Sequence, residues 1–188
     1  DAAGPALDPG ALFYNLGNPV AARGNLYQGA ADVFALVRLV KGWSFVVPGV
    51  NGGAPIHFDP AKILLVGHSQ GASTGPLASA YEPDVHAAIW SGAGAGLVLS
   101  LLGKTSPIDA PLAAAIALQE IDGSGPVRPN DLHPALGLVQ GLFDGVDPLN
   151  HGRAATTQRP AELGVQHVLM SYGIGDSFTP NSTGRAFA

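Results

Sequence analysis

Three short, largely apolar runs stand out along the chain, each bounded by turn-forming residues. They are Ile63–Val66, Val85–Trp90 and Val165–Ser171. Runs of this length without alternating polar positions are typical of strands buried on both faces of a sheet. We therefore expect three strands in a sheet that helices cover on both sides.

A helical pattern precedes the first of these runs. Asn25 can cap a helix that continues to about Lys41, where Gly42 suits the stop. Residues 1–24 are rich in Gly, Pro and Asn and are expected to form a loop. Within the helix, apolar side chains recur at the spacing of one helix face: Leu26, Ala30, Val33, Val37 and Val40.

Helical segments also separate the three runs from one another. One helix is expected from Ser69 to about Tyr81, although Gly75-Pro76 should strain it. Two more are expected at Pro111–Ile121 and Leu136–Phe143. Strands alternating with helices are typical of an α/β fold, so we expect a parallel sheet with crossover helices.

The composition narrows the class of protein. Of the 188 residues, 12% are charged and 46% hydrophobic, and the formal net charge is −5. Such a chain is not a disordered polyelectrolyte, and a basic nucleic-acid binder is not expected. The absence of cysteine excludes disulfides, zinc–thiolate sites and a cysteine nucleophile.

The strongest chemical signal is the segment Gly67–Gly71, which has the sequence Gly-His-Ser-Gln-Gly. It fits the G-x-S-x-G pattern directly after a buried strand and directly before a helix. The pattern predicts a sharp nucleophile elbow that exposes the Ser69 hydroxyl, with Gly67, His68 and Gly71 as its other members. The helix N-terminus would favour developing negative charge, and the backbone N–H of Gln70 would be one oxyanion donor.

A candidate acid follows the third run. Asp176 lies in Gly173–Pro180, a few residues beyond that strand. Because the carboxyl ends of parallel strands meet at one edge of a sheet, Asp176 is expected beside Ser69. An aspartate next to glycine is also common in simple turns, and that interpretation stays open. Two other acids could compete but are expected at helix ends or turns, namely Asp144 and Asp147.

The general base is the missing component, because no histidine follows Asp176. His68 adjoins Ser69, but an elbow normally directs that side chain away. His167 is expected near the start of the third strand, about 30 Å from Asp176 if the chain between them is fully extended. His86 is expected within the second strand. The other three are expected in loops, in surface or cap roles: His57, His133 and His151.

Taken together, these motifs resemble the α/β-hydrolase superfamily, and more narrowly the secreted or envelope-associated lipases and esterases of bacteria. The order of Ser69 before Asp176 matches the order in that superfamily. The likeness spans about Asn18 to Pro180. It is carried by four segments: Val66–Gly71, Thr74–Pro76, Asp147–Asn150 and Gly173–Pro180.

The resemblance implies one α/β-hydrolase domain over residues 1–188, with a helical cap insertion at about 97–152. It implies Ser69 as the nucleophile, Asp176 as the triad acid and a location outside the cell or in its envelope. It also implies earlier strands, and a helix, a last strand and a histidine after Asp176, all of which we expect to be missing from this chain. We therefore expect a partial domain, with a further chain or segment supplying the missing strands and the histidine.

The expected activity is ester hydrolysis through an acyl-enzyme on Ser69, with an ester or lipid as substrate and with no metal or organic cofactor. A peptidase or acyltransferase would use the same residues. A non-catalytic hydrolase-fold module for binding or assembly is the alternative from another class, motivated by the missing histidine. Apolar cap residues would suit either an acyl-chain pocket or packing on the core: Leu112, Ile116, Leu118, Leu136, Leu138, Leu142 and Phe143.

Overall fold

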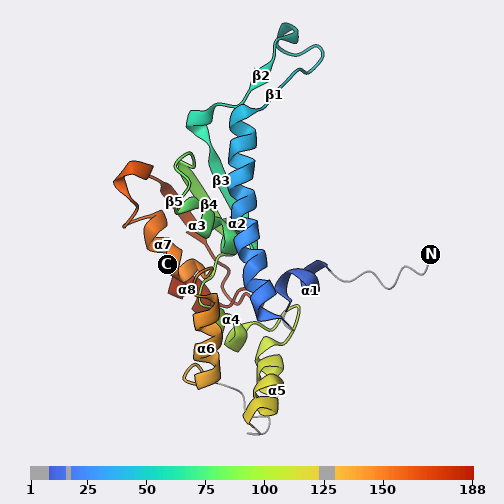
Figure 1. Ribbon diagram of the computed structural model, residues 1–188, viewed down its shortest axis with the longest axis vertical. Helices are drawn as coiled ribbons and strands as arrows, with labels where there is room; N and C mark the ends of the chain where they lie inside the picture. Colours follow the sequence, from blue (N-terminus) through green and yellow to red (C-terminus); the bar gives the residue numbers. More distant parts are fainter. Residues whose placement is uncertain (1–8, 16–17, 123–129) are drawn as a thin grey trace, which may run out of the picture.

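Three parallel strands form the centre of the protein (Figure 1). The computed structural model describes residues 9–15, 18–122 and 130–188. The strands are β3 (Leu64–His68), β4 (Ala87–Ser91) and β5 (His167–Ser171), in the order β3-β4-β5. The predicted α/β class with a parallel sheet is confirmed in this form. The shared register, for example Val66 beside Ile89 beside Leu169, brings the three carboxyl ends to one edge.

One face of this sheet is covered by helices. Trp90 of β4 is 1% exposed and packs in a cluster with Ala72 of α3 (Gly71–Ser79). Phe187 of α8 (Asn181–Phe187) packs against the same cluster. A Cβ on Gly75 would overlap the ring of Trp90. The Gly75-Pro76 pair inside α3 thus allows helix and sheet to approach closely, and the helix continues through the proline.

The opposite face is open, which corrects the prediction of strands buried on both sides. Leu64 and Val66 of β3 are 68% and 66% exposed, and Leu169 of β5 is 63% exposed. Ile89 of β4 is also exposed on this face. Apolar composition alone does not distinguish a covered face from an open one, and this is why the prediction was wrong.

The long helix before β3 begins earlier than predicted. It is α2 (Pro19–Gly42), and its N-cap is Asn18, whose side chain accepts a hydrogen bond from the N–H of Ala21. Asn25, the predicted cap, lies inside the helix. Its amide donates to the backbone oxygens of Leu12 and Phe13, which fixes the short helix α1 (Pro9–Tyr14) against α2. The prediction of a loop throughout residues 1–24 was therefore wrong.

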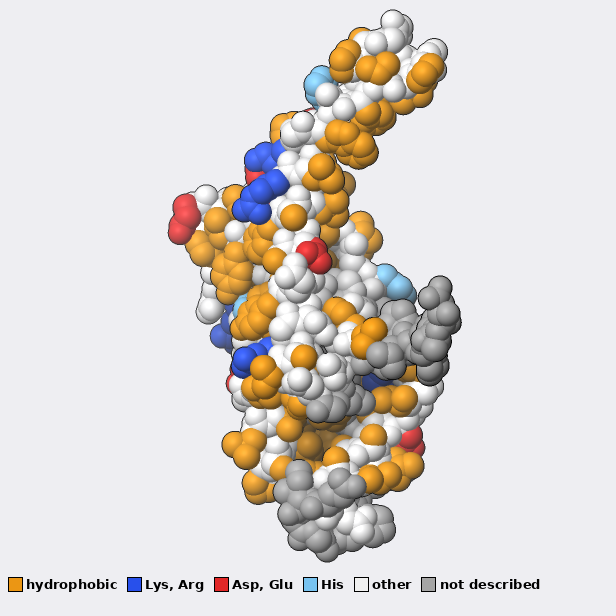
Figure 2. Space-filling model, turned by 45° about the vertical axis from the view of Figure 1, so that its right-hand side comes forward, with side chains coloured by type: hydrophobic (Ala, Val, Ile, Leu, Met, Phe, Trp, Pro, Cys, Tyr) orange, Lys and Arg blue, Asp and Glu red, His pale blue; other side chains and the backbone are white. Residues whose placement is uncertain are grey.

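A projecting hairpin connects α2 to β3. Its strands are β1 (Ser44–Phe45) and β2 (Ile56–His57), joined through the 3₁₀ turn η1 (Asn51–Gly53). The hairpin extends beyond the end of α2, and apolar side chains are distributed over it (Figures 1 and 2). An aromatic cluster stabilises its base: Trp43, Phe45 and Phe58. A second 3₁₀ turn, η2 (Pro60–Lys62), leads into β3.

The segment of the chain that connects β4 to β5 is largely helical. They are α4 (Leu97–Gly103), α5 (Ala110–Asp122), α6 (Pro134–Phe143) and α7 (Pro148–Ala155). Helices α5 and α6 confirm the two segments with helical periodicity, whereas α4 and α7 were not predicted. Several of the apolar residues expected in a cap pack together or on the core, namely Leu118, Leu136 and Phe143. Leu112, Ile116 and Leu138 are exposed.

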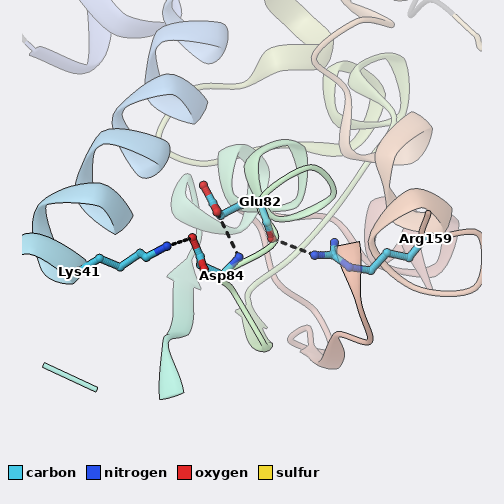
Figure 3. Close-up of polar contacts among 4 residues, drawn as sticks. All are labelled: Lys41, Glu82, Asp84 and Arg159. Carbon is cyan, nitrogen blue, oxygen red and sulfur yellow. Dashed lines mark hydrogen bonds and ion pairs between the residues drawn. The ribbon is translucent and has the colours of Figure 1, made fainter. Parts of the chain in front are cut away.

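The carboxyl end of α3 is held by a network of polar contacts (Figure 3). The guanidinium of Arg159 donates to the backbone oxygens of Ser79, Ala80 and Glu82, so it satisfies carbonyls that the end of the helix leaves free. Arg159 precedes the 3₁₀ turn η3 (Ala161–Leu163). On the other side, Lys41 at the end of α2 pairs with Asp84 at 2.5 Å. The contacts fix both flanks of the turn that leads into β4.

Candidate active site

Ser69 occupies a sharp turn between β3 and α3. Its φ is +53°, a left-handed conformation that residues other than glycine rarely adopt. The Ser69 N–H donates to the backbone oxygen of Ser91 at 2.9 Å, which anchors the turn to β4. The side chain is exposed. These features match the geometry that the motif predicts for an elbow.

The two glycines of the motif differ in their role. A Cβ on Gly67 would lie 2.6 Å from the carbonyl carbon of Gly71, so this position requires glycine for the backbone to fold back on itself. A Cβ on Gly71 would have nothing within 4 Å. A side chain would therefore collide with neighbouring atoms at Gly67, whereas at Gly71 it would meet nothing outside the backbone of its own helix.

The N-terminus of α3 presents a free donor next to Ser69. Gln70 is the N-cap residue, and the first N–H groups of a helix have no partner within it. Ala72 donates to the oxygen of Ser69, and Ser73 and Thr74 donate to that of Gln70. No acceptor for the N–H of Gln70 occurs among the described residues. This N–H is available to an anion at the turn, as an oxyanion donor must be.

A pocket of about 290 Å³ brings Ser69 and Asp176 together. The two residues come from the ends of β3 and β5, which β4 separates, and the parallel order of the sheet places both ends at one edge. The lining residues are His68, Ser69, Gly92, Asp176, Phe178 and Thr179. None of them belongs to helices α4–α7, so the apolar residues of those helices do not form this pocket.

The loop after β5 fixes one oxygen of Asp176 and leaves the other free. Oδ1 accepts hydrogen bonds from the N–H groups of Phe178 at 2.8 Å and Thr179 at 2.9 Å. The loop also contains Gly175, with a φ of +74°, whose N–H donates to Asn181 at the start of α8. Oδ2 has no hydrogen-bond partner within the described ranges. The carboxylate is thus held in place and still able to accept one further donor.

Of the six histidines, the structure places only His68 in this pocket. The Nδ1 atom of His68 lies 3.2 Å from the hydroxyl of Ser91, and no imidazole in the described part of the chain is hydrogen-bonded to the hydroxyl of Ser69. His86 directly precedes β4 rather than lying within the strand as predicted, and His167 begins β5, as predicted. Both therefore lie at the edge of the sheet away from Ser69. His57 is in β2, and His133 is the N-cap of α6.

His151 differs from its prediction, because it is 9% exposed inside α7 rather than in a loop. Its Nε2 lies 3.1 Å from the backbone oxygen of Gly145, which can only accept, so Nε2 carries the proton. In the neutral ring, Nδ1 then accepts from the hydroxyl of Tyr81 at 3.2 Å. Both ring nitrogens are occupied by structural contacts, so His151 takes no part in the pocket.

Asp147 and Asp144 lie at helix ends, as expected. Asp147 is 4% exposed and is the N-cap of α7. Its oxygens also accept from the N–H groups of Gly96 and Leu97, and from the side chain of Gln140. The carboxylate therefore connects α7 and α6 to the start of α4. Its role is architectural, and sequence spacing gave no indication of these contacts.

Helix α8 follows Asp176, which corrects the expectation that a helix would be missing there. Among the described residues, no group of three His, Asp or Glu side chains could hold a metal ion. In the same ranges, no helix has the length and hydropathy needed to span a membrane.

Comparisons with protein family models, with curated proteins and with solved structures found no match to this chain.

Proposed function

We propose that this chain carries the nucleophile and the acid of a serine ester hydrolase built on an α/β-hydrolase core. The observation that carries the proposal is the left-handed Ser69 at a strand–helix turn, in one pocket with the half-free carboxylate of Asp176. A left-handed, non-glycine residue stores backbone strain, and such strain concentrates at functional sites. The carbonyl of Gly71 lies too close to Gly67 for a side chain there, which supports the sharp strand–helix turn of a nucleophile elbow.

The proposed reaction is acyl transfer. The Oγ of Ser69 attacks the carbonyl carbon of the ester while its proton passes to an imidazole, which Oδ2 of Asp176 orients. The N–H of Gln70 donates to the oxyanion of the tetrahedral intermediate. Collapse of the intermediate expels the alcohol, which takes the proton from the imidazolium. Water then attacks the acyl-serine by the same route, releasing the acid and restoring Ser69.

The imidazole is proposed to come from outside the described residues, because within them no histidine is hydrogen-bonded to the Ser69 hydroxyl and the one that lines the pocket, His68, contacts Ser91 through Nδ1. This suggests a test by chemical rescue. Free imidazole added to the 188-residue chain should enter the open pocket and promote hydrolysis of p-nitrophenyl acetate. The rate above that of the Ser69→Ala variant should rise and saturate with imidazole. Asp176→Asn should lower that difference by an order of magnitude or more.

Two readouts make the result decisive. Mass spectrometry should locate an acetyl group on Ser69 when the reaction is quenched early, and a fluorophosphonate probe should label the same residue when imidazole is present. A folded chain with no difference from Ser69→Ala at any imidazole concentration would overturn the proposal. That outcome would favour the second candidate, a non-catalytic binding or structural module. This candidate is motivated by the Ser69 hydroxyl, which has no hydrogen-bond partner in the described part of the chain.

A further inference from the structure

Lys104 lies where the loop that contains Asp176, residues 173–180, meets the end of α4, the first helix after β4. It is the C-cap residue of α4. Its ammonium donates to the backbone oxygen of Phe178 at 2.7 Å and lies 5.7 Å from the centre of the Phe178 ring. A lysine at the end of a helix commonly binds the carbonyls of that helix. Lys104 instead binds a carbonyl 74 residues away in sequence.

The backbone next to Lys104 also binds the loop that contains Asp176. The N–H groups of Thr105 and Ser106 both donate to the oxygen of Ser177, at 2.9 and 3.1 Å. A Cβ on Gly103 would lie 2.9 Å from the Cβ of Pro180, so the two segments are in close contact. Residues 103–106 and 177–180 are therefore held together by three hydrogen bonds and direct packing.

This junction leads directly to the candidate acid. The peptide whose carbonyl Lys104 binds belongs to Phe178, and the N–H of Phe178 donates to Oδ1 of Asp176. Phe178 also lines the pocket. Burial lowers the pKa of the Lys104 ammonium below its usual value, and the Asp176 carboxylate acts in the opposite direction. The two charged groups are thus close enough to influence each other.

We propose that Lys104 is a positioning residue that fixes both Asp176 and the pocket wall at Phe178, and so connects helix α4 to the acid of the site. Its catalytic consequence rests on the proposed function above. The contact holds the carbonyl side of Phe178 while Asp176 holds its N–H. Loss of the ammonium would remove the contact that holds the carbonyl of Phe178, while the contacts of Ser177, Gly175 and Pro180 would remain.

Amide hydrogen exchange followed by NMR tests this inference without requiring turnover. In Lys104→Met, which keeps the apolar stem, the N–H groups of Phe178 and Thr179 should exchange about tenfold faster. Amides of β4 should be unaffected, and Lys104→Arg should restore most of the protection because it keeps a cationic donor. Lys62→Met is the matched control, since Lys62 is an exposed lysine of η2, which precedes β3, whereas the loop follows the carboxyl end of β5. Unchanged exchange at Phe178 and Thr179 in Lys104→Met would overturn the inference.

A second measurement covers the case in which Lys104→Met does not fold. The ammonium of Lys104 is titrated by NMR in the wild-type chain and in Asp176→Asn. Because Asp176 opposes the effect of burial, its neutralisation should lower the pKa of Lys104 further. An identical titration in both proteins would contradict the inference.

The imidazole-rescued esterase assay supplies the catalytic readout. Lys104→Met should lower kcat about tenfold with little change in KM, and Lys104→Arg should recover it, because a misplaced acid affects the reaction more than binding. A chain that shows the exchange and titration effects but no Ser69-dependent hydrolysis would reject the proposed function and retain the contact. A chain that hydrolyses esters but shows neither effect would reject Lys104 alone.

Discussion

The two faces of the central sheet use similar residues and have opposite surroundings. Ile89 and Trp90 are consecutive in β4 and point to opposite sides, since side chains alternate along a strand. Trp90 is 1% exposed, under α3 and α8, whereas Ile89 is 41% exposed. The same contrast separates Val168, which packs in the Trp90 cluster, from Leu169 on the open face.

This difference shows that apolar residues in a strand do not by themselves make a core. Burial stabilises the protein in proportion to the apolar area removed from water, so only the covered face contributes its full share. The centre of the open face nevertheless presents large apolar side chains, namely Leu64, Val66, Ile89 and Leu169. Substitutions on the two faces should therefore have very different effects on the free energy of unfolding, even between neighbours in the sequence.

The largest effect is expected at Trp90. Replacing it by alanine removes a fully buried ring and should lower the free energy of unfolding by about 3–5 kcal/mol. Ile89→Ala, one residue away, should cost about 1 kcal/mol or less because much of that side chain is already in water. Urea unfolding followed by circular dichroism measures both. Equal losses would show that the two faces are packed alike.

A smaller loss is expected where α3 contacts the covered face. Gly75→Ala would place a methyl group into the ring of Trp90 and should cost about 2–3 kcal/mol, because overpacking displaces helix or ring. Gly137→Ala in α6 is the matched control, since a Cβ there has nothing within 4 Å. It should be neutral or stabilise by up to about 1 kcal/mol. The midpoint of thermal unfolding should therefore fall in Gly75→Ala and stay the same or rise in Gly137→Ala.

The local pattern of the sequence was enough to predict the parallel sheet and helices α5 and α6. Short apolar runs and helical spacing are properties of neighbouring residues, and they survive folding. The start of α2 was missed because Asn18 and Asn25 are equally good caps by residue type. The difference lies in tertiary contacts, since Asn25 is occupied by carbonyls of α1. Helix α7 was missed because a helix end or a turn was expected at Asp147, and this left open whether a helix begins there.

The features of the candidate site also divide into those that the sequence could predict and one that it could not. The motif around Ser69 encodes a local turn, and its expected location could be stated from sequence. The proximity of Asp176 followed from the topology of a parallel sheet, which needs only the order of the strands. Lys104 could not be predicted, because its contact with Phe178 joins two loops with no sequence pattern in common. Contacts of this kind depend on how the helices outside the sheet pack, and no local pattern in a single sequence indicates that packing.

Two kinds of polar contact near the carboxyl end of α3 should differ in how much they stabilise the protein. Arg159→Met removes hydrogen bonds to the carbonyls of Ser79, Ala80 and Glu82, and should cost about 1–2 kcal/mol. Lys41→Met removes a partly exposed ion pair with Asp84 and should cost less than about 1 kcal/mol. Only the effect of Lys41→Met should disappear in 1 M NaCl, since salt screens exposed charges. Urea unfolding at two salt concentrations makes this comparison.

The smallest effect is expected on the open face itself. Val66→Thr keeps the branched shape that favours a strand and should change the free energy of unfolding by no more than about 0.5 kcal/mol, because Val66 is 66% exposed. Val168→Thr makes the same chemical change on the covered face. It should cost about 1–3 kcal/mol, since the hydroxyl enters the Trp90 cluster without a partner. If Val66→Thr were as costly as Val168→Thr, the open face would be covered in solution, and apolar contacts there would contribute to the stability of the protein.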